Sequence, residues 1–340
     1  MASGTIKVGI NGFGRIGRLA LRTMLSRYPN DIEVVAVNDL TDVAVNAHLL
    51  KWDSTYGPFD GDVTTEGSNI VVNGKTISVF AERDPGTIPW DKAGVDLVIE
   101  STGFFTDATK AAAHRNSGVK KVIISAPAKN EDITIVLGVN QDKYDPAAHN
   151  VISNASCTTN GLAPIAKVLN DSFGIDKGLL TTVHAYTNSQ RLQDTASKDL
   201  RDARAAAQNI VPSSTGAARA VGLVIPELVG KFHGMAFRVP TPTVSVVDFT
   251  ALLSKDATIA EVNGAVKAAA DSYLKGIVEY TELPLVSTDM RGNYHSSIYS
   301  AIDTVAVGGN LVKVVSWYDN EWGYSCRIAD LVNFVANKGL

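Results

Sequence analysis

Cysteine is scarce in this 340-residue sequence, and long apolar runs and metal-ligand spacings are absent from it. Cys157 and Cys326 are too few for a disulfide framework, and no CxxC or HExxH pattern indicates a metal site. No apolar run approaches the ~18 residues that span a bilayer, and the N-terminal residues lack a signal-peptide core. Thirty-one Lys and Arg against 35 Asp and Glu leave a net charge of -4, without a basic block for nucleic acid. The sequence therefore predicts a cytoplasmic protein with reduced thiols, in which neither a membrane nor nucleic acid is indicated as a partner.

What the sequence does contain is apolar residues, which make up 45% of a chain long enough for about two domains. Over the first 155 residues, short β-branched runs alternate with amphipathic stretches, which predicts βαβ units and a parallel sheet. These segments are residues 6–10, 16–28, 33–38, 95–100, 108–117, 119–125 and 151–154. Between them, residues 63–80 resemble a small antiparallel insertion built around an Asn73-Gly74 turn.

A G-x-G-x-x-G motif stands where the first predicted strand passes into the first predicted helix. Gly12 permits the tight turn, Gly14 lets the backbone approach a pyrophosphate, and Gly17 allows close helix packing. Taken alone, the motif is a weak signal, because glycines at a strand-to-helix turn can also be purely structural. Asp39 ends the second strand 22 residues after Gly17, where an acid accepts hydrogen bonds from an adenosine ribose. Its charge repels a 2′-phosphate, so the pair of features predicts NAD in preference to NADP.

The second half of the chain offers a nucleophile. Cys157 precedes an amphipathic stretch at 161–170, which places its sulfur near a helix N-terminus, where thiolate is favoured over thiol. The alternative is an inert buried cysteine, and the local sequence does not separate the two. His184 ends a β-branched strand 27 residues later, and a strand returning from the helix would bring its imidazole within reach of the sulfur.

These residues belong to six motifs that occur together over essentially the whole chain. The segments are 11–18 (NGFGRIGR), 153–160 (SNASCTTN), 184–187 (HAYT), 212–218 (PSSTGAA), 237–241 (FRVPT) and 317–325 (WYDNEWGYS). In this order they resemble the phosphorylating glyceraldehyde-3-phosphate dehydrogenases. The resemblance implies a Rossmann-type dinucleotide-binding domain at 1–155, and an α+β catalytic and oligomerisation domain with a mostly antiparallel sheet at 156–320. A C-terminal helix at 321–340 is then expected to pack back on the first domain.

The resemblance also implies a glycolytic activity and a homotetramer. D-Glyceraldehyde 3-phosphate, inorganic phosphate and NAD would give 1,3-bisphosphoglycerate and NADH through a thioester on Cys157, with His184 as the base. Two alternatives stay open at this stage. One is oxidation of erythrose 4-phosphate on the same fold, and the other is a nucleotide-binding redox sensor whose thiol is modified without turnover.

Further site residues follow from the resemblance, one by one. The dinucleotide contacts would come from Gly12, Gly14, Arg15, Ile16, Gly17, Asp39, Arg83, Ser125 and Asn320. The substrate's phosphate and the attacking phosphate would be bound by Ser156, Thr158, Thr187, Thr215, Gly216 and Arg238. No metal ligand is implied.

The chain departs from family patterns at a few positions. It has Ser189 where many bacterial members have aspartate, and Asp202 where they have a second arginine, which puts phosphate contacts from Arg201 and Arg204 in doubt. Strictly NAD-dependent members carry Leu-Pro where this chain has Thr195-Ala196, and photosynthetic relatives that accept NADP carry small residues there. We therefore expect NAD to be preferred and NADP to be accepted weakly.

Overall fold

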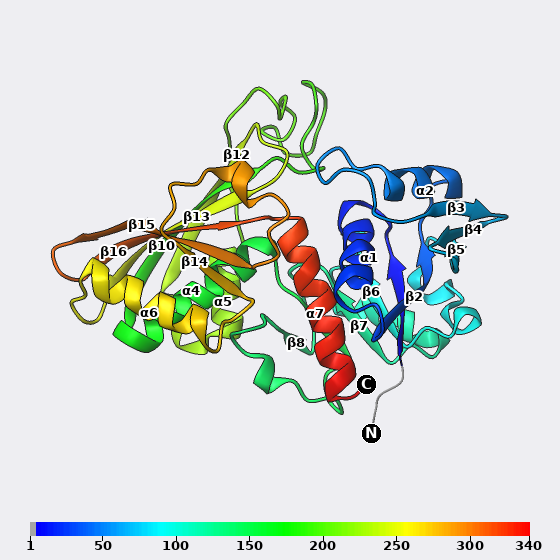
Figure 1. Ribbon diagram of the computed structural model, residues 1–340, viewed down its shortest axis with the longest axis horizontal. Helices are drawn as coiled ribbons and strands as arrows, with labels where there is room; N and C mark the ends of the chain where they lie inside the picture. The colour runs from blue at the N-terminus through cyan, green and yellow to red at the C-terminus, as the bar shows by residue number, and fades with distance from the viewer. Residues whose placement is uncertain (1–4) are drawn as a thin grey trace. The chain divides into compact units, whose positions relative to one another are not determined.

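The computed structural model describes residues 5–340, which divide into two compact units (Figure 1). The first unit comprises the chain up to Ile135, Asp142–Ala155 and Ser325–Leu340. The second comprises Val136–Gln141 and Ser156–Tyr324. Each unit is built around its own sheet, so each is described separately.

The first unit contains a nine-stranded sheet within the described residues. Its strands are β1 (Ile6–Asn11), β2 (Ile32–Asn38), β3 (Val63–Glu66), β4 (Asn69–Val72), β5 (Lys75–Phe80), β6 (Leu97–Glu100), β7 (Lys121–Ile124), β8 (Ile133–Thr134) and β9 (Val151–Ser153). Its helical segments are α1 (Arg15–Arg27), α2 (Val43–Lys51), α3 (Ala108–Ala111) and the 3-10 turns η1 (Pro85–Thr87), η2 (Trp90–Ala93) and η3 (Ala112–Ser117).

Strand order in this sheet is β3-β4-β5-β2-β1-β6-β7-β9-β8. Strand β1 pairs in parallel with β2 on one side and with β6 on the other. The chain therefore changes direction across the sheet at β1, and ligands of open α/β sheets bind at such a switch point, beyond the carboxyl ends of the strands. The prediction of a parallel, Rossmann-type sheet is confirmed.

The insertion predicted at 63–80 forms β3, β4 and the start of β5 as an antiparallel meander. Asn73 and Gly74 both have positive φ, 50° and 77°, as a two-residue hairpin turn requires. The meander is not separate from the main sheet, because β5 also pairs in parallel with β2. Helix α2 has no counterpart among the segments predicted from the sequence, and the stretch expected at 108–117 divides into α3 and η3.

Helix α7 (Trp322–Lys338) lies beside α1 in Figure 1. The Thr23 hydroxyl donates to the Ser325 carbonyl at 3.1 Å, and Arg27 forms an ion pair with Asp330 at 3.0 Å. Tyr28 also donates its hydroxyl to Asp330 at 2.7 Å. The C-terminal helix is thus attached to the first unit by polar contacts with α1.

The second unit contains a seven-stranded sheet within the described residues, in the order β11-β12-β10-β13-β16-β15-β14. The strands are β10 (Ile175–Ala185), β11 (Val211–Ser214), β12 (Phe232–Val239), β13 (Ser245–Leu253), β14 (Val278–Thr281), β15 (Ser297–Val307) and β16 (Leu311–Tyr318). The helices are α4 (Cys157–Phe173), α5 (Ala217–Val224) and α6 (Ile259–Asp271), with 3-10 turns η5 (Pro226–Leu228) and η6 (Ser287–Met290). The 3-10 turn η4 (Gln141–Lys143) begins in this unit, and its other two residues belong to the first unit. Pairings β10–β12 and β14–β15 are parallel and the other four are antiparallel, which confirms the mostly antiparallel sheet.

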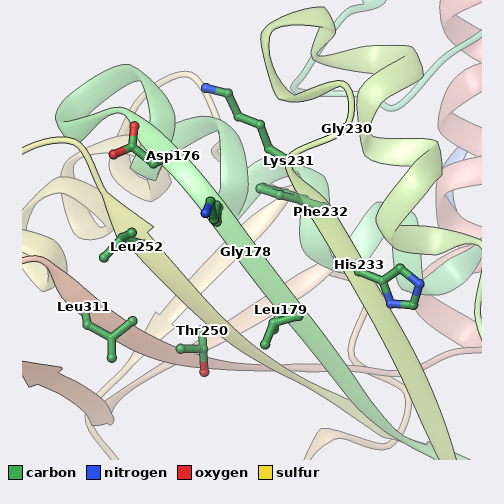
Figure 2. Close-up of a pocket in the computed structure, with 11 residues that line it drawn as sticks. Asp176, Gly178, Leu179, Gly230, Lys231, Phe232, His233, Thr250, Leu252 and Leu311 are labelled. Atoms are coloured by element: carbon green, nitrogen blue, oxygen red, sulfur yellow. The ribbon is translucent and has the colours of Figure 1, made fainter.

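Helices α4, α5 and α6 cover one face of this sheet in Figure 1. Burial alternates along β13, as expected for a strand with one covered face. The other face carries a shallow hollow of about 540 Å³, and Figure 2 shows Leu179, His233 and Thr250 on the adjacent strands that line it. Strand register places Leu179 opposite both of the others, and its side chain is 65% exposed. This face is accordingly open and partly apolar.

Candidate active site

A pocket of about 520 Å³ lies at the switch point of the first sheet. Its lining comes from the carboxyl ends of β1 and β2 and from the segments that follow β1, β2, β5 and β6. The lining residues are Asn11, Gly12, Gly14, Asn38, Asp39, Leu40, Glu82, Arg83, Ser101, Thr102, Phe104 and Phe105. Its size lies in the range of small-molecule and cofactor sites.

The glycine turn provides the close approach that a pyrophosphate needs. Gly12 has φ +88°, and a Cβ there would meet the Thr102 backbone nitrogen at 2.6 Å. A Cβ at Gly17 would meet the Gly12 carbonyl at 2.2 Å, whereas one at Gly14 would project into open space. Gly14 caps α1 without any side-chain hydrogen bond, so the first N–H groups of the helix are offered to an anion.

Asp39 lies half-buried beside this turn. One carboxylate oxygen accepts from the Phe13 N–H and the other from the Thr41 N–H, each at 2.8 Å. A carboxylate oxygen has two lone pairs, so both oxygens keep capacity for the two hydroxyls of a ribose. The residues of this pocket thus fit a dinucleotide whose pyrophosphate rests on the N-terminus of α1.

The other residues predicted to contact a dinucleotide lie in varied surroundings. Arg83 lines the pocket. Arg15 forms an ion pair with Asp53 at 2.6 Å, and Ile16 is half-buried in the first turn of α1. Ser125 follows β7 and donates its N–H to the Glu100 carbonyl at 2.9 Å.

In the second unit, Cys157 is the first residue of α4. Ser156 caps this helix, since its hydroxyl accepts from the Thr159 N–H at 3.0 Å. Ala155, just before the cap, adopts the left-handed conformation with φ +54°, which is a costly geometry for a residue other than glycine. The local backbone thus sets the thiol on the N-terminal turn of a 17-residue helix, as the sequence predicts.

Strand β10 brings His184 to the same place. Its Nε2 lies 3.5 Å from the Cys157 Sγ, within the reach of a hydrogen bond to sulfur. Arg238 on β12 is the register partner of His184, and its Nη1 lies 2.5 Å from His184 Nδ1. Three residues from three different elements therefore meet, although 81 residues separate the first from the last.

His184 is buried and Cys157 is half-buried, and the loss of water around the two groups changes how they ionise. Burial raises the pKa of the Cys157 thiol, although the positive charge of Arg238 opposes that shift. Burial, with help from Arg238, lowers the pKa of His184 to about 3. The imidazole therefore gains a proton only at low pH, and the thiol loses its proton only at high pH. Between these limits the pair holds one shared proton, and both shifts favour that proton on sulfur, so the resting pair is a thiol and a neutral imidazole and not the thiolate that the sequence predicts.

Tyr318, at the end of β16, is a site residue that residue-type reasoning missed. Its hydroxyl lies 2.8 Å from the Thr158 hydroxyl and 2.9 Å from the Thr182 hydroxyl, and its ring meets the His184 ring edge-on at 6.0 Å between centroids. Burial raises the pKa of Tyr318 well above its ordinary value, so the hydroxyl stays protonated. The signal for this residue was present in the 317–325 motif, where Tyr318 ends an alternating strand on the covered face.

Two of the predicted phosphate-binding hydroxyls already have partners next to Cys157. Ser156 uses its hydroxyl in the helix cap and also meets the Thr159 hydroxyl at 2.7 Å. Thr158 is 4% exposed and its hydroxyl is paired with Tyr318. Their part in binding phosphate stays a prediction.

Thr187, Thr215 and Gly216 lie at the ends of strands. Thr187 follows β10, and its hydroxyl lies 3.2 Å from the Ser189 hydroxyl. Thr215 follows β11 and accepts from the Ala217 N–H at 3.2 Å, while Gly216 is the N-cap of α5 and is exposed. The placement leaves polar groups accessible at both strand ends.

The residues at which the chain departs from family patterns have their own contacts. Arg204 forms an ion pair with Asp194 at 2.7 Å, and Arg201 donates to the Pro212 carbonyl at 3.3 Å. Thr195 and Ala196 are exposed in the long segment between β10 and β11. Asn320, predicted to contact the dinucleotide, is 5% exposed, and its side-chain oxygen accepts from the Ser245 hydroxyl at 2.9 Å.

Neither a metal-binding cluster nor a membrane-spanning helix is found in the described residues. Within residues 5–340, no group of three or more His, Cys, Asp and Glu side chains is arranged to hold a metal ion. No helix in that same range combines the length and apolar character needed to cross a membrane.

Comparison with known proteins identifies the family. Residues 6–108 match the family profile described as "Glyceraldehyde 3-phosphate dehydrogenase, NAD binding domain", and residues 156–320 match its "C-terminal domain". The chain is 63% identical to the glyceraldehyde-3-phosphate dehydrogenase of Geobacillus stearothermophilus and 61% identical to glyceraldehyde-3-phosphate dehydrogenase 1 of Bacillus subtilis (strain 168). Each match covers 98% of this chain and 99% of the relative. The chain therefore belongs to the glyceraldehyde-3-phosphate dehydrogenase family.

Proposed function

We propose that Cys157 and His184 carry out the NAD-dependent, phosphorylating oxidation of D-glyceraldehyde 3-phosphate in this protein. The family's activity, a reaction of glycolysis, belongs to the chain through its close relatives. The observation that carries the residue assignment is the 3.5 Å approach of His184 Nε2 to the Cys157 Sγ at the N-terminus of α4.

The first step uses the proton held by the pair. The Cys157 thiol proton moves to His184 Nε2 as the sulfur adds to the aldehyde carbon. The carbonyl π electrons move to oxygen, and the proton passes from Nε2 to that oxygen. The product is a hemithioacetal on Cys157. The backbone N–H of Cys157, in the first turn of α4, would donate to the developing oxyanion.

The oxidation returns that proton to the imidazole. NAD, when bound, accepts a hydride from the substrate carbon. His184 Nε2 removes the hydroxyl proton as the carbon–oxygen double bond forms again, which leaves a thioester on Cys157. Inorganic phosphate then attacks the thioester carbon, the carbon–sulfur bond breaks, and the acyl phosphate departs while sulfur regains its electron pair.

Binding of the two phosphates is part of the proposal. Arg238 supplies a guanidinium fork beside the reacting pair, and the exposed strand ends supply donors of the kind that phosphate prefers. The proposed donors are Ser156, Thr158, Thr187, Thr215, Gly216 and Arg238. For the dinucleotide, the proposed contacts are Gly12, Gly14, Arg15, Ile16, Gly17, Asp39, Arg83, Ser125 and Asn320.

We further propose that the protein acts in the cytoplasm as a homotetramer. The open face of the second sheet supports an assembly, because strand register aligns Leu179, Met235, Val305, Val307 and Leu311 on it, all of them exposed. An apolar sheet face of this kind is typical of a surface that meets another subunit. In domain terms we propose 1–155 for dinucleotide binding, 156–320 for catalysis and assembly, and 321–340 as a helix of the first domain.

The deciding experiment measures NADH formation from D-glyceraldehyde 3-phosphate with and without inorganic phosphate. We expect turnover to require phosphate, because only phosphate releases the acyl group from Cys157 at a useful rate. Turnover that is indifferent to phosphate, and faster with erythrose 4-phosphate, would support the four-carbon substrate instead. A protein that binds NAD but forms no NADH would support a thiol redox sensor.

A further inference from the structure

A buried carboxylate lies beneath the dinucleotide pocket and has no part in the chemistry described above. Glu100 ends β6 and is 2% exposed. One of its oxygens accepts from the Asn11 side-chain amide at 2.6 Å and from His114 Nε2 at 3.0 Å. The other accepts from the Thr102 N–H at 2.8 Å and from the Thr102 hydroxyl at 2.5 Å. Four donors therefore converge on one carboxylate, which satisfies its lone pairs completely.

On the His114 side of Glu100, Trp90 determines which atom donates in each hydrogen bond. The Trp90 indole N–H lies 3.1 Å from His114 Nδ1, and an indole nitrogen can only donate. His114 Nδ1 must therefore accept, which places the imidazole proton on Nε2, facing Glu100. A neutral histidine and an ionised Glu100 satisfy every one of these contacts.

On the other side of Glu100, Asn38 determines the orientation of the Asn11 side-chain amide. Its side-chain oxygen accepts from the Glu82 N–H at 2.8 Å, so its amide N–H₂ must point to the Asn11 side-chain oxygen, 2.8 Å away. Asn11 is thereby oriented with its own N–H₂ toward Glu100. The same Asn38 amide also donates to the Glu82 carbonyl at 2.9 Å. The chain of hydrogen bonds from Trp90 to Glu82 thus has one consistent polarity, with Glu100 as its pure acceptor.

This chain forms part of the pocket wall. Asn11, Asn38, Glu82 and Thr102 all line the pocket, and they come from the ends of β1, β2, β5 and β6. Asn11 and Thr102 also flank the Gly12 turn, where the Thr102 nitrogen is the nearest atom to a Cβ built on Gly12. A shift of either residue would therefore alter the turn on which a pyrophosphate would rest.

We propose that Glu100 is a positioning residue for dinucleotide binding, and that its ionised carboxylate holds the strand ends of the pocket in their binding geometry. The proposal rests on the proposed function, in which this pocket binds NAD. An amide at position 100 has only one acceptor oxygen for donors on two sides. Its N–H groups would meet either those of Asn11 and His114, which cannot reverse while Asn38 and Trp90 hold them, or the Thr102 N–H. A buried donor left without an acceptor is costly, so the strand ends would have to move.

The test is calorimetric titration of the substrate-free protein with NAD. The Glu100→Gln variant should bind NAD at least about tenfold more weakly than the wild type. The matched control is Glu66→Gln, an exposed acid on β3 whose replacement should leave NAD binding unchanged. Alkylation of Cys157 without NAD reports on the second unit and should be unaffected in both variants.

A second measurement separates positioning from a general loss of stability. Thermal unfolding of Glu100→Gln, measured beside its NAD titration, shows whether the NAD affinity falls in a protein that is still folded. If Glu100→Gln fails to fold, Glu100→Asp can replace it in the test. Aspartate retains the charge but is one methylene shorter, so its oxygens lie farther from the four donors, and NAD binding should weaken several-fold.

Several results would overturn the proposal. One is a folded Glu100→Gln variant with a lowered unfolding temperature but unchanged NAD affinity. Another is a folded Glu100→Asp variant with wild-type NAD affinity. Failure of the wild type itself to bind NAD would be a different result, because it would remove the proposed function of the pocket.

Discussion

Two polar clusters, one around Glu100 in the first unit and one around His184 in the second, differ in whether the direction of each hydrogen bond is fixed. Around Glu100, each hydrogen bond has one direction, because Trp90 and Asn38 leave no alternative. Around His184, Nδ1 lies 2.7 Å from the Ala185 carbonyl, an acceptor, and 2.5 Å from Arg238, a donor. A site that only binds gains from a fixed arrangement of donors. A site that moves a proton needs a group that can both accept and donate, and His184 Nδ1 faces one neighbour of each kind.

The largest expected effect comes from replacing the nucleophilic sulfur of Cys157. Cys157→Ser should lower the rate of NADH formation by at least about 10⁴-fold, since the hydroxyl is a far weaker nucleophile beside the same base. NAD binding, measured by titration, should stay at the wild-type level because the pocket is built by the first unit. Residual activity within tenfold of wild type would show that oxidation proceeds without this thiol.

Removing only the base should have the next largest effect. His184→Asn retains a polar side chain of similar reach but has no group that accepts a proton at neutral pH. We expect the rate of hydride transfer in single-turnover measurements to fall by about 10²- to 10⁴-fold. His233→Asn, on the open face of the same sheet, is the matched control and should keep the wild-type rate. Equal rates for all three proteins would remove His184 from the mechanism.

The dinucleotide pocket of the first unit leads to a smaller prediction, which concerns cofactor specificity. Asp39→Ala should narrow the NAD to NADP ratio of kcat/KM by about tenfold or more, because the carboxylate repels the 2′-phosphate. The double variant Thr195→Leu/Ala196→Pro should widen the NAD to NADP ratio. The expected change is that of one added apolar contact, ~1 kcal/mol. Wild-type NADP efficiency equal to that of NAD would contradict the weight given to Asp39.

The smallest effect is expected at Tyr318. Tyr318→Phe removes the hydroxyl shared by Thr158 and Thr182, and leaves two buried hydroxyls with one partner fewer. The free energy of unfolding should fall by about 1–2 kcal/mol. The rate of NADH formation should change by less than about tenfold, because the ring still packs against His184. A loss of activity as large as that of His184→Asn would place the Tyr318 hydroxyl in the proton transfer itself.

The two clusters also differ in how far the sequence predicts them. The glycine turn and Asp39 are local signals, because a strand, a turn and a helix follow one another within 30 residues, and parallel pairing aligns the strand ends. The meeting of Cys157 with His184 was inferred from spacing, but Arg238 joins them only through the register of β10 and β12. Glu100, His114 and Tyr318 gave no signal as residue types, since their partners come from other strands. Tertiary register, rather than local pattern, decides such contacts.

The most direct test of a proton shared between Cys157 and His184 is the pH profile of Cys157 alkylation without substrate. Because the pair takes up its second proton only near the lowered pKa of His184, about 3, and loses its last only above the ordinary thiol range, the wild-type rate should form a plateau across neutral pH. In His184→Asn the plateau should disappear, and the rate should rise only at alkaline pH, since burial raises the pKa of the lone thiol. Identical profiles for the two proteins would contradict a shared proton.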